Sequence, residues 1–180
     1  MTWAAFLLML ASTVVATGTH LLKPAKRPTP LKVGLTVISF AIALAAAIVA
    51  VIAMHDPDAA AVPFVLVVTA SVVFAVAIGS PYTELVFHLA ANHQARKTKS
   101  PAGESPLRGG LWIGLLERTA FVCTLWANWP EGIAVILAIK GLGRFSELKD
   151  HNAAEQFILG TFSSSLCAAG AYGLGLMLLG

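Results

Sequence analysis

Apolar residues gather into six runs, and polar or proline-containing segments separate one run from the next. A membrane-spanning helix needs about 20 mostly apolar residues, because the hydrocarbon core is about 30 Å thick and a helix rises about 1.5 Å per residue. The runs have about this length, apart from a shorter fifth one. We therefore expect six transmembrane helices, at residues 3–22, 33–54, 60–79, 109–128, 132–148 and 153–179.

The segments between the runs contain residues that end helices. Residues 23–32 contain three prolines, each of which lacks an amide donor and has a fixed φ. Gly79-Ser80-Pro81 is expected to stop or kink the third helix for the same reason. Residues 128–131 and 149–152 predict tight turns, which would make hairpins of the last three helices.

Residues 80–108 are expected to form a cytoplasmic segment, an amphipathic helix followed by a loop. Within 82–92, apolar residues recur at helical spacing with polar residues between them. This pattern is typical of a helix that lies at the membrane interface. A continuation of the third helix into the cytoplasm fits equally well. Residues 93–108 are polar and predict a flexible loop.

The first apolar run has a second interpretation, a cleaved signal peptide. Signal peptides carry positive charge ahead of the apolar stretch and a site of small residues after it. No Lys or Arg precedes residues 3–22, and no clear cleavage site follows them. We expect an uncleaved helix.

Composition agrees with a membrane protein. The chain has 180 residues, of which 57% are hydrophobic and only 12% are charged. Soluble domains carry roughly 25% charged residues, and disordered chains combine low hydrophobicity with high charge. Both classes are excluded, and the two cysteines are too few for a disulfide scaffold. The predicted fold is one all-α polytopic bundle over 1–180, with three apolar spans in 1–79 and three spans that carry the charges in 109–180.

The basic residues predict the orientation of the bundle. They occupy the first, third and fifth loops, whereas the second and fourth loops have none. Basic loops stay in the cytoplasm, so both termini are expected outside, in an N-out/C-out topology. Short basic clusters between apolar runs are typical of such loops, and the net charge of +3 therefore predicts no nucleic-acid partner.

The last three spans contain a cluster of ionisable residues. A charge inside a span is costly, and it needs a partner, water or a role. Glu117 lies twelve residues before Trp129 and Lys140 lies eleven after it, so an antiparallel hairpin would place them at similar depth. We expect these two residues to form an ion pair.

Further members of the cluster follow Lys140. Arg144 and Glu147 fall at i+4 and i+7 from Lys140 and would share its helix face. Glu155 is expected in the first turn of the sixth helix, at the depth of Arg144, where it could pair with that residue. Arg118 points about 100° away from Glu117 and is expected to reach the interface by snorkelling.

This cluster has two interpretations. In the structural one, the ion pairs hold three helices in register. In the functional one, Arg118, Lys140 and Arg144 bind an anionic ligand in a cytoplasm-facing pocket, and Glu117, Glu147 and Glu155 form ion pairs or relay a proton. The number of ionisable groups favours the functional interpretation.

Small and hydroxylated residues form a seam along the sixth helix. Such residues let membrane helices approach closely, and hydroxyls can bond across the interface. Packing is the favoured role of this seam, which includes Gly160, Thr161, Ser163 and Ser164.

Motifs of common enzyme classes are absent from the sequence. It lacks the phosphate-binding GxxxxGK[ST], the zinc-binding HExxH, and the GxSxG of serine hydrolases. The five histidines are scattered over loops and helix ends. We expect no metal site and no cofactor, and the sequence leaves open whether the protein is an enzyme.

Residues 109–173 resemble the C-terminal region of uncharacterised bacterial membrane proteins related to the domain of unknown function 3307 family. The first 108 residues show no such similarity. The resemblance implies a bacterial inner (plasma) membrane location and a charged cluster shared by the family, but no activity. It rests on Ile113-Gly114, Leu116-Glu117-Arg118, Ala138-Ile139-Lys140, Arg144-Phe145, Glu147-Leu148-Lys149-Asp150, Ala154-Glu155, Leu159-Gly160-Thr161 and Ser164.

Three functions are compatible with this sequence. The first is a small transporter, carrier subunit or lipid-handling protein, with membrane lipids, anionic ones in particular, as partners. The second is an accessory or assembly subunit that binds another membrane protein or a second copy of this chain. The third is an intramembrane enzyme acting on a lipid, with Glu117 or Glu155 as general base.

Overall fold

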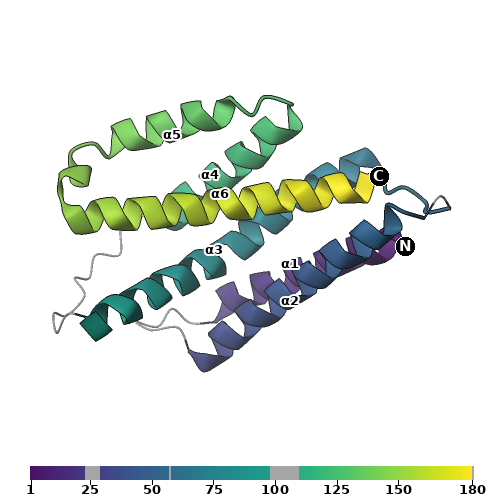
Figure 1. Ribbon diagram of the computed structural model, residues 1–180, viewed down its shortest axis with the longest axis horizontal. Coiled ribbons are helices and arrows are strands. Elements are labelled where there is room, and N and C mark those ends of the chain that lie inside the picture. The colour runs from purple at the N-terminus through teal and green to yellow at the C-terminus, as the bar shows by residue number, and fades with distance from the viewer. Residues whose placement is uncertain (23–28, 57, 98–109, 180) are drawn as a thin grey trace.

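The computed structural model describes the backbone of residues 1–22, 29–56, 58–97 and 110–179, and their side chains except at 21, 91–97, 110, 111, 147 and 152. This part of the chain is all helical (Figure 1). Its α-helices are α1 (Thr2–Leu21), α2 (Pro30–Ala53), α3 (Phe64–Lys97), α4 (Gly110–Trp126), α5 (Gly132–Gly143) and α6 (His151–Leu179), with a short 3₁₀ helix at Glu147–Lys149.

Successive helices run in alternating directions, and both termini lie at the same end of the molecule (Figure 1). Four helices are long and apolar enough to cross a membrane: α1, α2, α3 over Phe64–Ala90, and α6 over Ala153–Leu179. The other two are shorter. At about 1.5 Å per residue, α4 is about 25 Å long and α5 about 18 Å, less than the hydrocarbon thickness of about 30 Å.

The fifth predicted span, 132–148, is wrong as a continuous helix. α5 ends at Gly143, and residues 144–146 turn before the 3₁₀ helix begins. Gly141 and Gly143 lie close to this end, and glycine both weakens a helix interior and favours its termination. Arg144 follows as the C-cap.

Gly79-Ser80-Pro81 was expected to stop or kink the third helix, and the first of these alternatives is wrong. α3 passes through Pro81 and continues to Lys97. Pro81 cannot donate to the carbonyl of Ala77, and the His20 ring nitrogen from α1 lies 3.4 Å from that carbonyl oxygen. The Thr83 hydroxyl donates to the Gly79 carbonyl at 2.8 Å. Neighbouring side chains can thus satisfy the backbone groups that a proline frees, which allows a membrane helix to continue.

This continuation decides between the two interpretations of residues 82–92. They form part of α3, so a separate interfacial helix is not found, and the apolar part of the third helix extends to Ala90. Of the loop expected at 93–108, residues 93–97 are helical instead, and residues 98–108 lie outside the described residues.

α1 and α2 form a closely packed antiparallel pair, and α3 and α6 form a second large contact. The Ser12 hydroxyl of α1 donates to the Ser39 carbonyl of α2 at 2.7 Å. Small buried residues such as Ala16, Ala46 and Ala50 allow this close approach. α2 has far fewer contacts with α3 and α6 than with α1.

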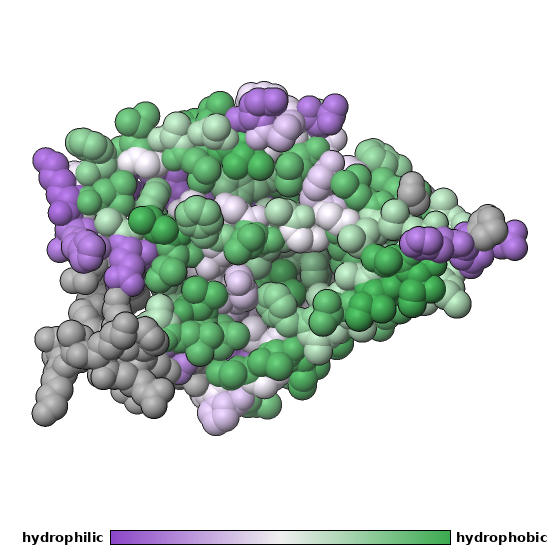
Figure 2. All heavy atoms as spheres, in the orientation of Figure 1, coloured by the Kyte–Doolittle hydropathy of each residue, from purple (hydrophilic) through white to green (hydrophobic). Residues whose placement is uncertain are grey.

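The outer surface of the bundle is rich in large apolar side chains. Val14, Leu44, Val65 and Leu116 are each more than 60% exposed. Figure 2 shows apolar residues over most of this face, with polar residues gathered toward the ends and the upper edge. Contiguous apolar surface on this scale indicates contact with lipid rather than with water.

Candidate functional site

Glu117 and Lys140 form the ion pair that the hairpin spacing predicts. Lys140 Nζ lies 2.6 Å from both carboxylate oxygens of Glu117. The Glu117 side chain is 5% exposed and that of Lys140 is 17% exposed. The Lys140 ammonium also lies 5.3 Å from the centre of the Phe157 ring on α6, so the pair links α4 and α5 to α6.

The expectation that Arg118 snorkels to the interface is wrong. Arg118 is only 2% exposed, and its Nη2 donates to the Ser80 hydroxyl on α3 at 2.9 Å. Gly79 and Gly114 leave the space that the guanidinium fills. Arg118 Nε has no hydrogen-bond partner in the described part of the structure. Arg118 therefore packs inward between α4 and α3.

Arg118 and Lys140 make their contacts on different helices. Lys140 meets Glu117 from α5, whereas Arg118 meets α3 through Ser80. Lys140 thus contacts Glu117 directly, whereas the hydrogen bond of Arg118 goes to a different helix. Anion binding by either residue stays a prediction.

The predicted helix face of Lys140, Arg144 and Glu147 is wrong beyond Lys140. α5 ends at Gly143, so the later two residues no longer follow helical spacing from Lys140. Arg144 is partly buried at the C-cap. The Glu147 side chain lies outside the described residues, and its role as an ion pair or relay stays a prediction.

Glu155 is not in the first turn of the sixth helix, contrary to expectation. α6 begins four residues earlier, at His151, and the Asp150 carboxylate caps it by accepting from the Ala153 amide at 2.9 Å. Glu155 is partly buried, one turn into the helix. Its pairing with Arg144 stays a prediction.

The seam on α6 lies within the bundle. Thr161, Ser163 and Ser164 are buried, and a side chain at Gly160 would approach the Phe87 ring of α3 to 3.2 Å. The Ser163 hydroxyl donates to the carbonyl of Leu159 in its own helix at 2.7 Å. These contacts agree with a packing seam between α6 and α3.

A cavity that the sequence did not indicate lies between α2, α3 and α6. Its volume is about 260 Å³. Phe40, Ala43, Leu44 and Ala47 line it from α2, and Phe74, Ile78 and Tyr82 from α3. α6 contributes Leu166, Cys167, Gly170, Ala171 and Leu174.

The walls of this cavity are apolar, and it opens sideways. Leu44 of α2 is 64% exposed and Leu166 of α6 is 61% exposed, so the side between these helices faces the surroundings of the bundle. Both helices lie on the face toward the viewer in Figures 1 and 2. In a membrane, this side would meet lipid chains.

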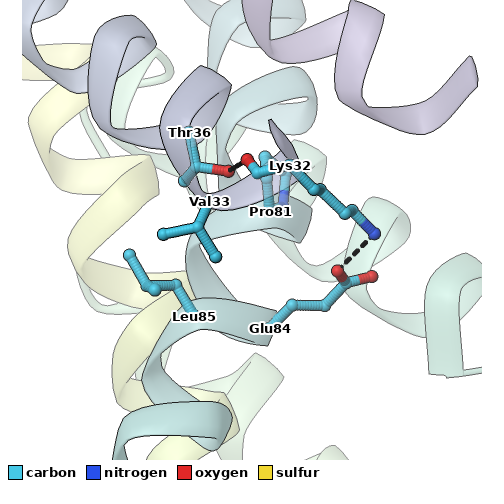
Figure 3. Close-up of a pocket in the computed structure, with 6 residues that line it drawn as sticks. All are labelled: Lys32, Val33, Thr36, Pro81, Glu84 and Leu85. Carbon is cyan, nitrogen blue, oxygen red and sulfur yellow. Dashed lines mark hydrogen bonds and ion pairs between the residues drawn. The ribbon is translucent and has the colours of Figure 1, made fainter. Parts of the chain in front are cut away.

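A second ion pair lies between α2 and α3, beyond one end of the cavity. Lys32 Nζ lies 2.5 Å from a Glu84 carboxylate oxygen across a small depression (Figure 3). The Phe40 and Tyr82 rings, with centroids 5.1 Å apart, line the cavity at the end nearer this pair. Sequence reasoning assigned Lys32 only to a basic loop and did not single out Glu84 as a partner.

The sequence contains one signal that places Lys32 in a helix and not in a loop. Lys32 follows Thr29-Pro30, and a threonine N-cap with proline at the first helical position marks a helix start. The Thr29 hydroxyl accepts from the Lys32 amide, which places Lys32 in the first turn of α2 instead of in the loop. Nothing in the sequence indicated which residue of α3 would face it.

The described part of the chain is all helical, with four helices able to cross a membrane, an apolar side cavity, the largely buried Glu117–Lys140 ion pair and the more exposed Lys32–Glu84 pair. Among the described residues, no group of three His, Cys, Asp or Glu side chains could hold a metal ion. Comparisons with family models, with curated proteins and with solved structures find no match for this chain. The resemblance of residues 109–173 to the domain of unknown function 3307 family stays a prediction.

Proposed function

We propose that this chain is a small lipid-handling protein of a bacterial inner membrane, and that it takes a lipid acyl chain into the cavity between α2, α3 and α6. The six-span topology with both termini outside is part of this proposal. The observation that carries it is the apolar cavity of about 260 Å³ with an open side between α2 and α6.

The dimensions and chemistry of the cavity support an acyl chain as the occupant. Small-molecule sites usually measure about 300–1,000 Å³, so this cavity of about 260 Å³ lies just below that range and suits one chain better than a whole lipid. Its walls are almost entirely aliphatic and aromatic, with Tyr82 and Cys167 as the polar exceptions. Its open side is flanked by large apolar residues, where lipid chains are the surrounding medium.

The charge pattern supports the direction in which the lipid would lie. Lys32 belongs to the first group of basic residues, which the positive-inside rule places at the cytoplasmic face. Basic residues between spans on that face commonly contact anionic lipid head groups. A lipid of the inner leaflet would therefore place its head group toward Lys32 and its chain in the cavity.

Native mass spectrometry of the purified chain tests this function. Ala43→Phe combined with Ala47→Phe places two rings in the cavity, and we expect this variant to lose most of the lipid that remains bound to the wild type after detergent exchange. Ala41→Phe is the matched control, because Ala41 lies on the same helix, is exposed and does not line the cavity. Equal lipid retention by both variants would contradict the proposal.

The accessory-subunit hypothesis is the second candidate. Gly170 is exposed beside the cavity opening, and a small residue there would let a partner's helix approach α6 closely. Site-specific photo-crosslinking from position 166 in native membranes separates the two. A lipid adduct supports the first proposal, and a discrete protein adduct favours the second.

A further inference from the structure

The Lys32–Glu84 ion pair joins α2 to α3 beside a small depression (Figure 3). We infer that Lys32 selects a lipid with an anionic phosphate head group, and that Glu84 competes with that head group for the Lys32 ammonium. This inference rests on the proposed function, because it names the class of lipid that the same cavity takes.

The two members of the ion pair are held very differently. The Lys32 side chain is 17% exposed, whereas that of Glu84 is 54% exposed. The Thr36 hydroxyl donates to the Lys32 carbonyl at 2.9 Å, and the Lys32 amide is bonded at the N-cap, so the backbone of Lys32 is fixed. The more exposed Glu84 carboxylate has room to turn outward, whereas the Lys32 side chain is largely covered and starts from a fixed backbone beside the depression.

The ion pair lies a short distance along α2 and α3 from the cavity. Phe40, which begins the α2 lining of the cavity, lies two helical turns from Lys32, or about 12 Å along the axis. On α3, Tyr82 lines the cavity while Pro81, Glu84 and Leu85 line the depression beside Lys32. A chain in the cavity would thus leave its head group on the Lys32 side of the Phe40–Tyr82 ring pair.

The charges that line this depression would favour an anionic head group over a zwitterionic one. Lys32 and Glu84 are the ionisable residues that line it, and they neutralise each other when no ligand is present. A phosphodiester anion could replace the carboxylate at the ammonium and release Glu84 to water. A zwitterionic head group would gain less, because its own cation would be brought near Lys32.

Lipid competition in nanodiscs tests this inference on the full chain. The discs contain phosphatidylglycerol and phosphatidylcholine in equal amounts with identical acyl chains, and native mass spectrometry gives the ratio of the two lipids retained. We expect the wild type to retain more phosphatidylglycerol. Lys32→Gln should lower the ratio roughly fivefold, as expected for the loss of one basic residue at an anionic lipid.

Glu84→Gln provides the decisive comparison. It should raise the phosphatidylglycerol ratio, because the competing carboxylate is gone while Lys32 remains. If the ion pair only holds α2 against α3, both variants should be less stable than the wild type and the lipid ratio should stay unchanged. That result would overturn the inference. Lys149→Gln, an exposed basic residue away from the depression, controls for the loss of one positive charge.

Two further results separate this inference from the proposed function. If the Ala43→Phe, Ala47→Phe variant loses both lipids while Lys32→Gln leaves their ratio unchanged, the lipid cavity stands and the head-group assignment fails. If the wild type retains neither lipid, both fail. Added inorganic phosphate should not displace bound phosphatidylglycerol, and displacement would show that free phosphate is the ligand instead.

Discussion

Arg118 occupies the space that a side chain at Gly79 would need. A Cβ atom built on Gly79 would lie 2.1 Å from Arg118 Nη1 and 2.3 Å from its Cδ. The conflict includes the Cδ atom in the middle of the side chain, so a small movement of the guanidinium alone cannot relieve it. The absence of a side chain at Gly79 is thus what allows Arg118 to lie against α3 and reach Ser80.

We expect Gly79→Ala to destabilise the bundle by about 1–3 kcal/mol, the usual cost of overpacking a well-packed interior. Chemical unfolding in detergent measures this change. Gly34→Ala is the control, since nothing lies within 4 Å of a Cβ at that position. It should be neutral or stabilise α2 by up to about 1 kcal/mol, because alanine favours the helix over glycine.

The steric conflict between Arg118 and a side chain at position 79 predicts that substitutions at these two positions are energetically coupled. In an Arg118→Ala background, the cost of Gly79→Ala should fall to the level of the Gly34→Ala control, since the clashing atoms are gone. A double-mutant cycle measures this interaction. Additive effects of the two substitutions would show that the side chains do not compete for the same space.

The Glu117–Lys140 pair should be costly to break from one side. Lys140→Met leaves the Glu117 carboxylate buried without its partner, and we expect a loss of about 3 kcal/mol. Glu117→Leu together with Lys140→Met removes both charges and should recover most of that loss. Lys149→Met, at an exposed position, should have little effect. If the double variant loses as much as the two single variants together, the residues do not stabilise each other.

The indole of Trp126 predicts a third stability effect. Its Nε1 donates to the Ser71 hydroxyl of α3 at 2.8 Å, and its ring packs at near right angles on Tyr172 of α6. Ser71→Ala leaves the indole N–H without this acceptor and should cost about 1–3 kcal/mol. Thr69→Ala removes an exposed hydroxyl that bonds only within α3, and it should stay within about 0.5 kcal/mol of the wild type. Equal costs at the two positions would contradict this role for Ser71.

Cysteine labelling tests the number of spans and their orientation. In a background without Cys123 and Cys167, Asp58→Cys should react with an impermeant maleimide from outside intact cells. Lys149→Cys should react only after the membrane is permeabilised. The opposite pattern would reverse the orientation that the basic residues predict.

Glu131→Cys decides whether the short α4–α5 hairpin crosses the membrane. Six spans require it to react from outside, as Asp58→Cys does. A reaction only after permeabilisation would show that α4 and α5 do not cross, and that the bundle has four spans. Both positions are exposed in the structure, so failure to react cannot come from burial.

The sequence by itself determined the features that depend on residues close together in the chain. The apolar runs correctly predicted that the described part of the chain is all helical, because a run of about 20 apolar residues has the length of a membrane-spanning helix. The Glu117–Lys140 contact could also be predicted, since both residues lie at similar distances from one tight turn. An antiparallel hairpin then leaves little freedom in how the two helices align.

Tertiary structure decided the features that depend on helices far apart in the chain. Pro81 was expected to end or kink a helix, yet α3 continues through it, and the Ala77 carbonyl that it leaves without a donor lies near His20 of α1. Arg118 was expected at the interface, yet Gly79 of α3 provides space for it in the interior. The cavity and the Lys32–Glu84 pair follow from how α2 packs beside α3 and α6, and the spacing of residues along one helix carries no information on that packing.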